Sequence, residues 1–568
     1  TKEAYCFIVP AFIYMILVLG YPIVYNIILS LKDVNVKNLK SGTSVFVGLQ
    51  NYIDLFHDPT FLLVLRNTFI FTIACLIFQF TIGFAFAMFF NQKFKLAGPI
   101  RGLILVSYMM PMAVTGLLGK NIFSNAGLIN DLLGKIGISG PEWLVNTSTA
   151  LIAVIIMNCW VGIPFNMLLL VSGLTSISPD VYESASMDGA NWGQRFLFIT
   201  LPLMKESILA VLMLGFIYTF RAFDLMYIMT AGGPLNSTDV LGTYSYMLSF
   251  TQFNFSKGAA VAMVLFACLF LIGLFYLKLL SKERRKADMD NMTGAEKAKE
   301  IRNSIFALLI AFIFLFPIYW LIQISFKSDA ETFGKVLTYF PHDFTFEPWL
   351  ENLTDKTFLI SLKNSFLNGL LTMAIALVLG VPAAYGMGRY RVKGGNVFLL
   401  TFLISQMLPP SLTLTPMYLI FSKLGFLGNH LTAPVAIAAS SIPFVIVTLR
   451  PYFRSIPVSL DEAARLDGCG SVKAFLMVML PAVKTGIITI MVISFLNGWN
   501  DLVYSMTFNV AEIMRPLTAN IYKFQSAYGT RWNCIMAYGA ILVLPVILMF
   551  IFLQKYIVGG LVAGAVKD

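Results

Sequence analysis

Polar and charged side chains recur inside three long apolar stretches of this chain. Such side chains are costly within a membrane and usually mark a binding site or a pathway. Amide, hydroxyl and charged groups can exchange hydrogen bonds with a polar ligand, which is binding chemistry and requires no bond to break. The residues are Asn158 in the first stretch; Tyr218, Thr219, Arg221 and Asp224 in the second; and Asn497, Trp499, Asn500 and Asp501 in the third.

Other kinds of chemistry have little support in the sequence. There is no Gly-x-x-x-x-Gly-Lys-Ser/Thr stretch, so the chain has no phosphate-cradling loop of its own. The six cysteines are isolated and lack disulfide or metal-ligand spacing. The three histidines, His57, His342 and His430, stand singly. We therefore expect no catalytic residues, no metal site and no directly bound cofactor.

The composition is that of a membrane protein. Of the 568 residues, 58% are hydrophobic and 12% are charged, and the mean hydropathy is +0.78. So few polar groups could not cover a soluble globule. The net charge of +11 comes from short basic clusters beside apolar runs, which the positive-inside rule explains without nucleic acid.

Twelve apolar stretches are long enough to cross a bilayer as helices, which takes about 20 residues each. The sequence predicts an all-α polytopic protein with two homologous six-helix domains. We place the first domain at 1–281, a polar linker or subunit junction at 282–302 and the second domain at 303–568. The expected spans are roughly 5–31, 64–90, 100–120, 150–172, 206–230 and 257–280, then 303–326, 362–388, 395–421, 430–450, 484–507 and 534–556.

The charges of the short connections predict the orientation. Basic residues that fall on one side of the alternating spans should face the cytoplasm. Lys32, Lys37 and Lys40 fall on the other side, in a longer loop. The residues expected at the cytoplasmic side are Lys93, Lys95, Arg101, Arg195, Lys205, Arg389, Arg391, Lys393, Arg450, Arg454, Arg465, Lys473 and Lys484.

One segment on the predicted cytoplasmic side occurs twice. Residues 180–203 and 459–482 share eight residue types at a constant offset of 279 positions, without a gap. The shared residues are Glu183, Ala185, Asp188, Gly189, Phe196, Leu197, Leu201 and Pro202, matched by Glu462, Ala464, Asp467, Gly468, Phe475, Leu476, Leu480 and Pro481.

Each copy predicts a short helix, a turn and a second helix. Asp180 and Ser459 have the capping-box spacing to Glu183 and Glu462, so we expect them to be N-caps. The glycine of each copy stands where a helix C-terminus favours positive φ. The Leu-Pro pair should end the second helix. A pair of well-capped surface helices would explain the Glu and the Gly but not the identity between the copies.

The pattern Glu-x-Ala-x-x-x-Asp-Gly, followed by Leu-Pro, resembles the cytoplasmic coupling loop of binding-protein-dependent ABC importer permeases, and both copies are similar to the carbohydrate branch. The resemblance covers nearly the whole chain. It implies the type I importer permease fold, with both halves joined in one chain although such permeases are usually separate subunits. It also implies that each copy docks on an ATPase subunit through Tyr182, Glu183, Ala185, Met187, Asp188 and Gly189, or through Glu462, Ala464, Leu466, Asp467 and Gly468.

The resemblance further implies a sugar site. Positions matching Asn158, Gly162 and Phe165, and Gly215, Tyr218, Thr219 and Ala222, contact sugar in the maltose permease. An amide can bond hydroxyls and an aromatic ring can stack on a pyranose. This chain departs from the maltose pattern in the second group, which puts maltose itself in doubt. The alternative is helix packing through Gly162, with Asn158 bonded to a neighbouring span.

Arg221 and Asp224 allow two interpretations. Three positions apart on one helix, they could neutralise each other. Alternatively, Arg221 could face an acidic sugar such as a uronate.

The sequence thus predicts a multi-pass permease of the bacterial inner membrane that imports a di- or oligosaccharide, neutral or acidic, by ATP-driven alternating access. The partners it implies are two cytoplasmic ABC ATPase subunits that bind ATP and Mg, an extracytoplasmic solute-binding protein, membrane lipid and the sugar. The alternative is a secondary active transporter with internal repeats and no ATPase. A receptor or scaffold without transport is harder to reconcile with charges inside both halves.

Overall fold

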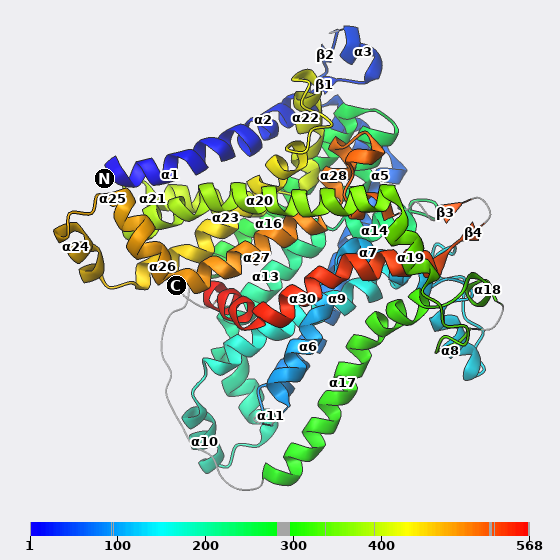
Figure 1. Ribbon diagram of the computed structural model, residues 1–568, viewed down its shortest axis with the longest axis horizontal. Helices are drawn as coiled ribbons and strands as arrows, with labels where there is room; N and C mark the ends of the chain where they lie inside the picture. The colour runs from blue at the N-terminus through cyan, green and yellow to red at the C-terminus, as the bar shows by residue number, and fades with distance from the viewer. Residues whose placement is uncertain are drawn as a thin grey trace.

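Helices make up most of the computed structural model (Figure 1). It describes residues 2–41, 43–92, 94, 96–280, 296–334, 337–390, 392–521, 525–526 and 529–565. The strands of this part form two small antiparallel hairpins. β1 (Lys32–Asp33) pairs with β2 (Val45–Phe46), and β3 (Gln525–Ser526) pairs with β4 (Gly529–Thr530). The prediction of an all-α membrane fold is confirmed.

Among the described residues, eight unbroken helical stretches are long and apolar enough to cross a membrane. The first is α1 (Lys2–Met15), which continues through a π-helical turn at Ile16–Gly20 into α2 (Tyr21–Ser30). The other seven are α5 (Pro59–Phe90), α9 (Ala150–Thr175), α16 (Phe255–Leu280), α17 (Glu296–Ser325), α20 (Lys356–Arg389), α23 (Thr432–Ser455) and α30 (Trp532–Ala565).

Four further spans are bent pairs, which brings the count to the predicted twelve. Prolines at or beside several breaks remove a backbone N–H and clash with the preceding turn. The pairs are α6 (Ala97–Met109) with α7 (Met112–Ile122), bent by 90°; α11 to α12 (Trp192–Leu203) with α13 (Lys205–Phe220), 70°; α21 (Gly395–Gln406) with α22 (Pro410–Lys423), 92°; and α25 to α26 (Ser471–Ala482) with α27 (Lys484–Asn500), 85°.

Short helices fill the connections between these spans. On the side of the predicted cytoplasmic loops are α10 (Pro179–Met187) and α24 (Val458–Leu466). The remaining ones are α3 (Val36–Ser41), α4 (Gln50–His57), α8 (Leu128–Lys135), α14 (Asp224–Thr230), α15 (Leu241–Tyr246), α18 (Asp329–Thr332), α19 (Glu347–Thr354), α28 (Val503–Phe508), the 3-10 turn η5 (Glu512–Met514) and α29 (Leu517–Asn520).

The fifth span of each half is shorter than predicted. We expected continuous helices over 206–230 and 484–507, but α13 ends at Phe220 and α27 ends at Asn500. A new short helix then begins at Asp224 or Val503. The physical reason is visible in the second half, where Asp501 Oδ2 accepts the free backbone N–H of Ser505 at 2.8 Å. A carboxylate stabilises a helix N-terminus and therefore favours a break at this point.

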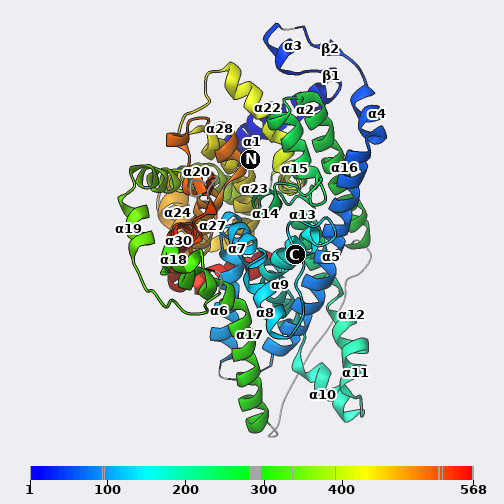
Figure 2. The same cartoon turned by 90° about the vertical axis from the view of Figure 1, so that its right-hand side faces the viewer.

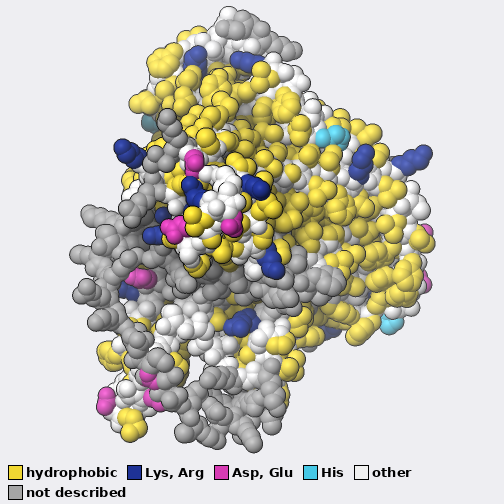
Figure 3. Space-filling view, turned by 60° about the vertical axis from the view of Figure 1, so that its left-hand side comes forward, with side chains coloured by type: hydrophobic (Ala, Val, Ile, Leu, Met, Phe, Trp, Pro, Cys, Tyr) yellow, Lys and Arg dark blue, Asp and Glu magenta, His cyan; other side chains and the backbone are white. Residues whose placement is uncertain are grey.

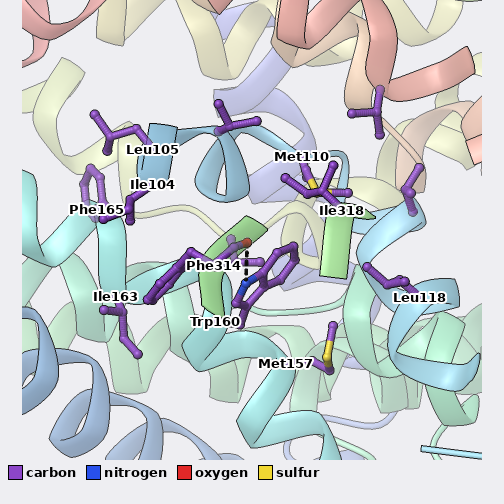
Figure 4. Packing of buried hydrophobic residues seen from close by; sticks show 14 of the residues in the cluster. Ile104, Leu105, Met110, Leu118, Met157, Trp160, Ile163, Phe165, Phe314 and Ile318 are labelled. Atoms are coloured by element: carbon purple, nitrogen blue, oxygen red, sulfur yellow. Dashed lines mark hydrogen bonds between the residues drawn. The ribbon is translucent and has the colours of Figure 1, made fainter. Parts of the chain in front are cut away.

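The first helix of each half packs on the other half. Phe7 and Ile8 of α1 lie in one core cluster with Tyr385 of α20, and α17 packs against α6 and α30. Figure 4 shows the contact between α9 and α17, where Trp160 Nε1 donates to the carbonyl of Phe314 at 3.3 Å. The two sequence halves are therefore not separate packing units. Residues 281–295, most of the predicted linker, lie outside the described residues, so the domain boundaries stay a prediction.

The ends of the molecule agree with the predicted orientation. In Figure 1, α24 lies at the left and α10 at the lower left, whereas α3, α8 and α18 lie at the top and right, and Figure 2 likewise separates α10 from α3. Lys93, Lys95 and Arg391 lie outside the described residues. Between the ends, Figure 3 shows a broad apolar surface. Leu17 of the first span and Val378 of α20 are 62% and 71% exposed, as lipid-facing residues are.

Candidate functional site

The repeated segment folds identically in both halves. α10 ends in a turn at Gly189 with φ +79°, and α24 ends at Gly468 with φ +78°. In the first copy the N–H of Ala190 donates to Ala185 O at 2.9 Å and that of Gly189 donates to Ser186 O at 3.1 Å. This is a Schellman turn, which needs a left-handed residue at the glycine position. The predicted positive-φ glycines are confirmed.

The predicted capping boxes are wrong. Both helices begin two residues earlier than predicted: α10 has Ser178 as N-cap and Pro179 in the first turn, and α24 begins after Pro457. Neither N-cap side chain makes a capping hydrogen bond. Proline is pre-organised for the first helical position, so it starts the helix without a side-chain cap. Glu183 has a buried Oε1 without a hydrogen-bond partner.

Each short helix presents an apolar side chain that is almost fully exposed. Met187 is 88% exposed and Leu466 is 89% exposed, although both precede the turn by only two residues. Asp188 and Asp467 are the exposed C-caps, and Glu462 is exposed as well. Exposed apolar side chains on a short, rigid helix fit the geometry of an anchor for a partner groove.

Tyr182, Ala185 and Ala464 face inward. The hydroxyl of Tyr182 lies 3.0 Å from Thr200 Oγ1 and so ties α10 to the helix that follows. Ala464 is 6% exposed, and Ala185 is half-buried. Tyr182 therefore fixes the angle between the two helices. The exposed side chains of Trp192 and Phe198, and not that of Tyr182, extend the exposed apolar surface of this segment. Neither aromatic residue was among those predicted from the sequence.

The Leu-Pro pair ends the second helix as predicted. Each copy passes through a π-helical turn, Phe196–Thr200 or Phe475–Met479, and the helix ends one residue after the proline. The chain then bends by 70° into α13 and by 85° into α27. Because these two helices carry Tyr218 and Asn497, each repeated segment is continuous with one wall of the polar region inside the membrane.

Aromatic rings from three helices meet in that region. Phe165 of α9 stacks on Tyr108 of α6, with ring centroids 4.9 Å apart, and makes an edge contact with Tyr218 of α13 at 6.0 Å. The guanidinium of Arg221 lies 4.9 Å from the centre of the Tyr218 ring. We call Tyr108, Phe165, Tyr218 and Arg221 the aromatic layer. Tyr108 was missed because a lone tyrosine in an apolar span carries no sequence signal.

Arg221 and Asp224 do not neutralise each other as an ion pair in this structure. The side chain of Arg221 donates from Nη1 to the carbonyl of Gln406, 3.0 Å away at the end of α21. Asp224 begins α14, and its buried Oδ1 has no hydrogen-bond partner. The prediction of one shared helix face is wrong because the helix breaks between the two residues. Arg221 connects the first half to the second instead.

The glycines of the predicted sugar site lie at helix contacts. A Cβ on Gly162 would meet the amide of Gln79 on α5 at 2.3–2.5 Å, and Gln79 Nε2 donates to the carbonyl of Asn158 at 3.1 Å. A Cβ on Gly215 would lie 3.0 Å from Leu76, and Thr219 is buried. The packing interpretation therefore explains Gly162 best, while Phe165 and Tyr218 remain candidates for ligand contact.

The residues selected in the second half do not form one cluster. Asn497 is exposed, and its Nδ2 donates to Ser441 Oγ at 3.1 Å. Trp499 is fully buried against Phe366 and Phe495, with Nε1 bonded to the carbonyl of Leu542. Its role in this conformation is packing. Asn500 has a buried Oδ1 without a partner, and Asp501 caps α28.

Two cavities lie between the halves on the side of the aromatic layer away from α10 and α24. The smaller one, beside Arg221, has a volume of about 10 Å³. The larger one has a volume of about 460 Å³. It is lined by Tyr227, Tyr246, Met506, Glu512, Arg515, Ala519 and Asn520. None of these residues was selected from the sequence, although Tyr227 lies in the Asp224–Thr230 segment that the second half repeats.

The family model described as "Binding-protein-dependent transport system inner membrane component" matches residues 79–286 and 376–562. The two matches contain α10 and α24 respectively. They also include the aromatic layer and every residue that lines the larger cavity.

Named relatives match half of the chain at a time. The diacetylchitobiose uptake system permease protein DasC of Streptomyces coelicolor is 28% identical over 46% of this chain and 96% of its own length. The sulfoquinovosyl glycerol transport system permease protein SmoG of Agrobacterium fabrum is 32% identical over 48% and 88%. The trehalose/maltose transport system permease protein MalF of Thermococcus litoralis is 31% identical over 41% and 79%.

A solved structure is also similar to one half. A chain of a bacterial ABC transporter involved in the import of the acidic polysaccharide alginate is 24% identical, with a TM-score of 0.42 over 47% of this chain and 99% of that chain.

Proposed function

Because the chain belongs to the family of binding-protein-dependent transport system inner membrane components, we propose that its two permease domains together import a di- or oligosaccharide. It is a multi-pass protein of the inner membrane. The relatives named for diacetylchitobiose, trehalose/maltose and sulfoquinovosyl glycerol support a sugar as the transported class. We propose that a solute-binding protein delivers the sugar from the extracytoplasmic side.

The observation that supports an external ATPase most strongly is the pair of matched cytoplasmic helices. α10 and α24 have the same length, the same glycine turn and one apolar anchor each. The sequence has no phosphate loop. Two ATPase subunits, each holding ATP and Mg, would dock one on each helix through Met187 or Leu466.

The chain runs directly from each docking helix to the transport pathway, which supplies a mechanism for coupling ATP hydrolysis to transport. A rigid turn at Gly189 transmits movement of α10 to α11 and α12, and the 70° bend passes it to α13. The end of α13 carries Tyr218 and Arg221, so its displacement would separate the aromatic layer from Gln406. The second copy acts in the same way through α27. Rigid helices moving about short hinges are a common route of alternating access.

Within the pathway, we propose that Phe165 and Tyr218 stack on the sugar and that Arg221 and Asn497 bond its hydroxyl or acidic groups. Tyr218 is 41% exposed although its neighbours Ile217 and Thr219 are buried, so its ring is available for contact. Asn158, Asn500 and Asp501 are second candidates for polar contacts, because each lies on the same helix as a residue of this pathway or directly after it.

Reconstitution tests this function. The purified chain alone should hydrolyse no ATP, whereas vesicles that also contain the ATPase subunits and the binding protein should take up a sugar only when ATP is present. The alternative, a secondary transporter, predicts uptake driven by an ion gradient without ATP. ATP-independent uptake, or rapid hydrolysis by the chain alone, would contradict the proposal.

A further inference from the structure

The larger cavity has the size and position of a binding site of its own. Its volume of about 460 Å³ lies within the range of about 300–1,000 Å³ that is usual for small-molecule sites. First-half residues, Tyr227 of α14 and Tyr246 at the end of α15, form one side. Residues from α28 to α29 of the second half form the other. A ligand here would contact both halves at once.

The chemistry of the lining fits a pyranose. The rings of Tyr227 and Tyr246 meet edge to face, with centroids 5.5 Å apart, and offer aromatic surface and hydroxyl groups. Glu512, Arg515 and Asn520 add a carboxylate, a guanidinium and an amide. Aromatic rings with a few fixed polar groups are what a sugar with an apolar face and hydroxyl edges requires.

Two of these polar groups, Arg515 and Asn520, are held in place by hydrogen bonds to their neighbours. Arg515 donates from Nε to the carbonyl of Asn509 at 3.0 Å. Asn520 is 6% exposed and uses its Nδ2 for Ser361 Oγ at 2.8 Å and the carbonyl of Glu512 at 3.0 Å. The Oδ1 of Asn520 is thereby left as an acceptor for a ligand. Side chains fixed before binding lose little entropy when the ligand arrives.

The segment that carries these residues is itself anchored to α20. Asn364 Nδ2 donates to the carbonyl of Ile513 at 2.8 Å and to that of Arg515 at 3.3 Å. The N–H of Leu517 donates to Ser365 Oγ at 2.8 Å. The cavity wall is therefore a supported structure with defined side-chain positions.

The aromatic layer blocks the passage of a sugar beyond this cavity. The space beside Arg221 has a volume of about 10 Å³, enough for one water molecule and too small for a sugar. Arg221 also bonds Gln406 of the other half across the path. In this conformation a sugar can occupy the larger cavity but cannot pass Arg221.

We propose that the larger cavity is an outer receiving site, which binds one neutral pyranose unit of the incoming oligosaccharide before the aromatic layer opens. The proposal rests on the sugar-import function proposed above. Glu512 and Arg515 line the same space with opposite charges. An anionic sugar would be attracted by Arg515 and repelled by Glu512. A neutral unit can bond both.

Labelling of a cysteine in the cavity tests the site. Met506→Cys would be made in the chain assembled with its ATPase subunits in vesicles, and labelled from the extracytoplasmic side by a charged methanethiosulfonate without ATP. The unchanged chain, with its six cysteines, gives the background. The probes are maltose, trehalose, diacetylchitobiose and sulfoquinovosyl glycerol, of which the last carries a sulfonate. We expect at least one transported neutral sugar to slow labelling several-fold.

Uptake kinetics give a second readout that does not depend on the cysteine. Glu512→Gln and Arg515→Gln should each raise the KM of sugar uptake about tenfold, the equivalent of one lost hydrogen bond of about 1.4 kcal/mol, with an unchanged maximal rate. Combined with Met506→Cys, both should also abolish the protection of the introduced thiol by sugar. Glu347→Gln and Arg66→Gln, which alter exposed residues outside the cavity, are the matched controls and should leave KM unchanged.

The outcomes separate this proposal from the proposed function. Normal ATP-driven uptake, with the introduced thiol unprotected and KM unchanged in both cavity variants, would overturn the receiving site and leave the import function intact. Stronger protection by sulfoquinovosyl glycerol than by every neutral sugar would overturn the choice of a neutral unit. Absence of ATP-driven uptake of all four sugars, with protection of the introduced thiol by a neutral one, would support the site and count against their import.

Discussion

Asn67 and Asn364 make the same contact in the two halves of the molecule: each donates from Nδ2 to two carbonyls in the segment after a broken fifth span. The Asn67 amide reaches Asn236 O at 3.0 Å and Asp239 O at 3.3 Å, and the Asn364 amide reaches Ile513 O and Arg515 O at 2.8 and 3.3 Å. Asn67 and Asn364 each stand two residues before a phenylalanine, Phe69 or Phe366, so a sequence match between the halves corresponds to an equivalent hydrogen-bond pattern.

The residues that follow extend this equivalence. Thr68 Oγ1 accepts the N–H of Leu241 at 3.0 Å, as Ser365 Oγ accepts that of Leu517 at 2.8 Å. The anchored segments nevertheless differ in what they carry. The second one supplies Arg515 to the larger cavity, whereas the first one buries Asp239.

Substituting either asparagine should therefore lower stability by a similar amount, but only one of the two substitutions should affect sugar uptake specifically. Asn67→Ala and Asn364→Ala each remove two hydrogen bonds to backbone carbonyls, which should lower the free energy of unfolding by about 1–3 kcal/mol. If the receiving site exists, only Asn364→Ala should also raise the KM of sugar uptake. Thermal unfolding and uptake measured on both variants check this, and an equal rise in KM for both would argue against a specific role of the Arg515 segment.

Gly189→Asp and Gly468→Asp should uncouple ATP hydrolysis from transport without unfolding the protein. A side chain at φ near +78° costs about 1–2 kcal/mol, and the new carboxylate lies on the docking surface. A Cβ at either position meets nothing within 4 Å, so the fold should persist. The measurement is sugar-stimulated ATPase activity with the partner subunits present.

Gly137→Asp is the matched control for this experiment. Gly137 also has φ +78° and open space around its Cβ, but it follows α8 at the opposite end of the molecule. It should show the same loss of stability with normal stimulated ATPase activity. Normal activity in both docking variants would show that these helices do not couple.

Removing Arg221 should not be compensated by removing Asp224. Since the structure contains no ion pair between them, Arg221→Ala and Asp224→Ala should affect stability additively, within about 0.5 kcal/mol. Expression and thermal unfolding of both single variants and the double variant provide the measurement. Recovery of expression in the double variant would restore the ion-pair interpretation.

Arg221→Gln tests whether this residue recognises negative charge. If it does, uptake of sulfoquinovosyl glycerol should fall more than uptake of trehalose, at normal expression, because a guanidinium binds a sulfonate through charge-assisted hydrogen bonds. An equal fall for both sugars would indicate that Arg221 serves closure of the pathway through Gln406 and not selection of acidic sugars.

Asp239 should make stability depend on pH. Burial raises the pKa of this carboxyl from 3.8 to about 6, against a lowering by the hydrogen bond from Thr243. Between these values the folded protein binds more protons than the unfolded chain, so stability should fall as pH rises from about 4 to 6 and be constant above. Asp239→Asn should remove this slope in Tm, whereas Asp343→Asn, at an exposed site, should keep it. A slope that persists in Asp239→Asn would assign it to another group.

The sequence by itself determined the class, the twelve apolar spans and the two repeated short helices, α10 and α24. Long apolar runs can only cross a membrane as helices, because lipid offers no hydrogen-bond partners to the backbone. The glycines at 189 and 468 were predictable since the turn after a helix selects a residue that tolerates positive φ. These features follow from the conformational preferences of short segments and from an internal repeat that a single sequence reveals.

Which side chains contact one another in the interior was decided only by the tertiary structure. The break after Phe220 separates Arg221 from Asp224, and the bonded partner of Arg221 is a carbonyl 185 positions away in the chain. Gly162 has its role because Gln79 of another helix lies against it. The larger cavity is assembled from Tyr227 and Arg515, which no spacing relates. Sequence periodicity shows which face of a helix is apolar, but which helix covers that face depends on the packing of all spans together.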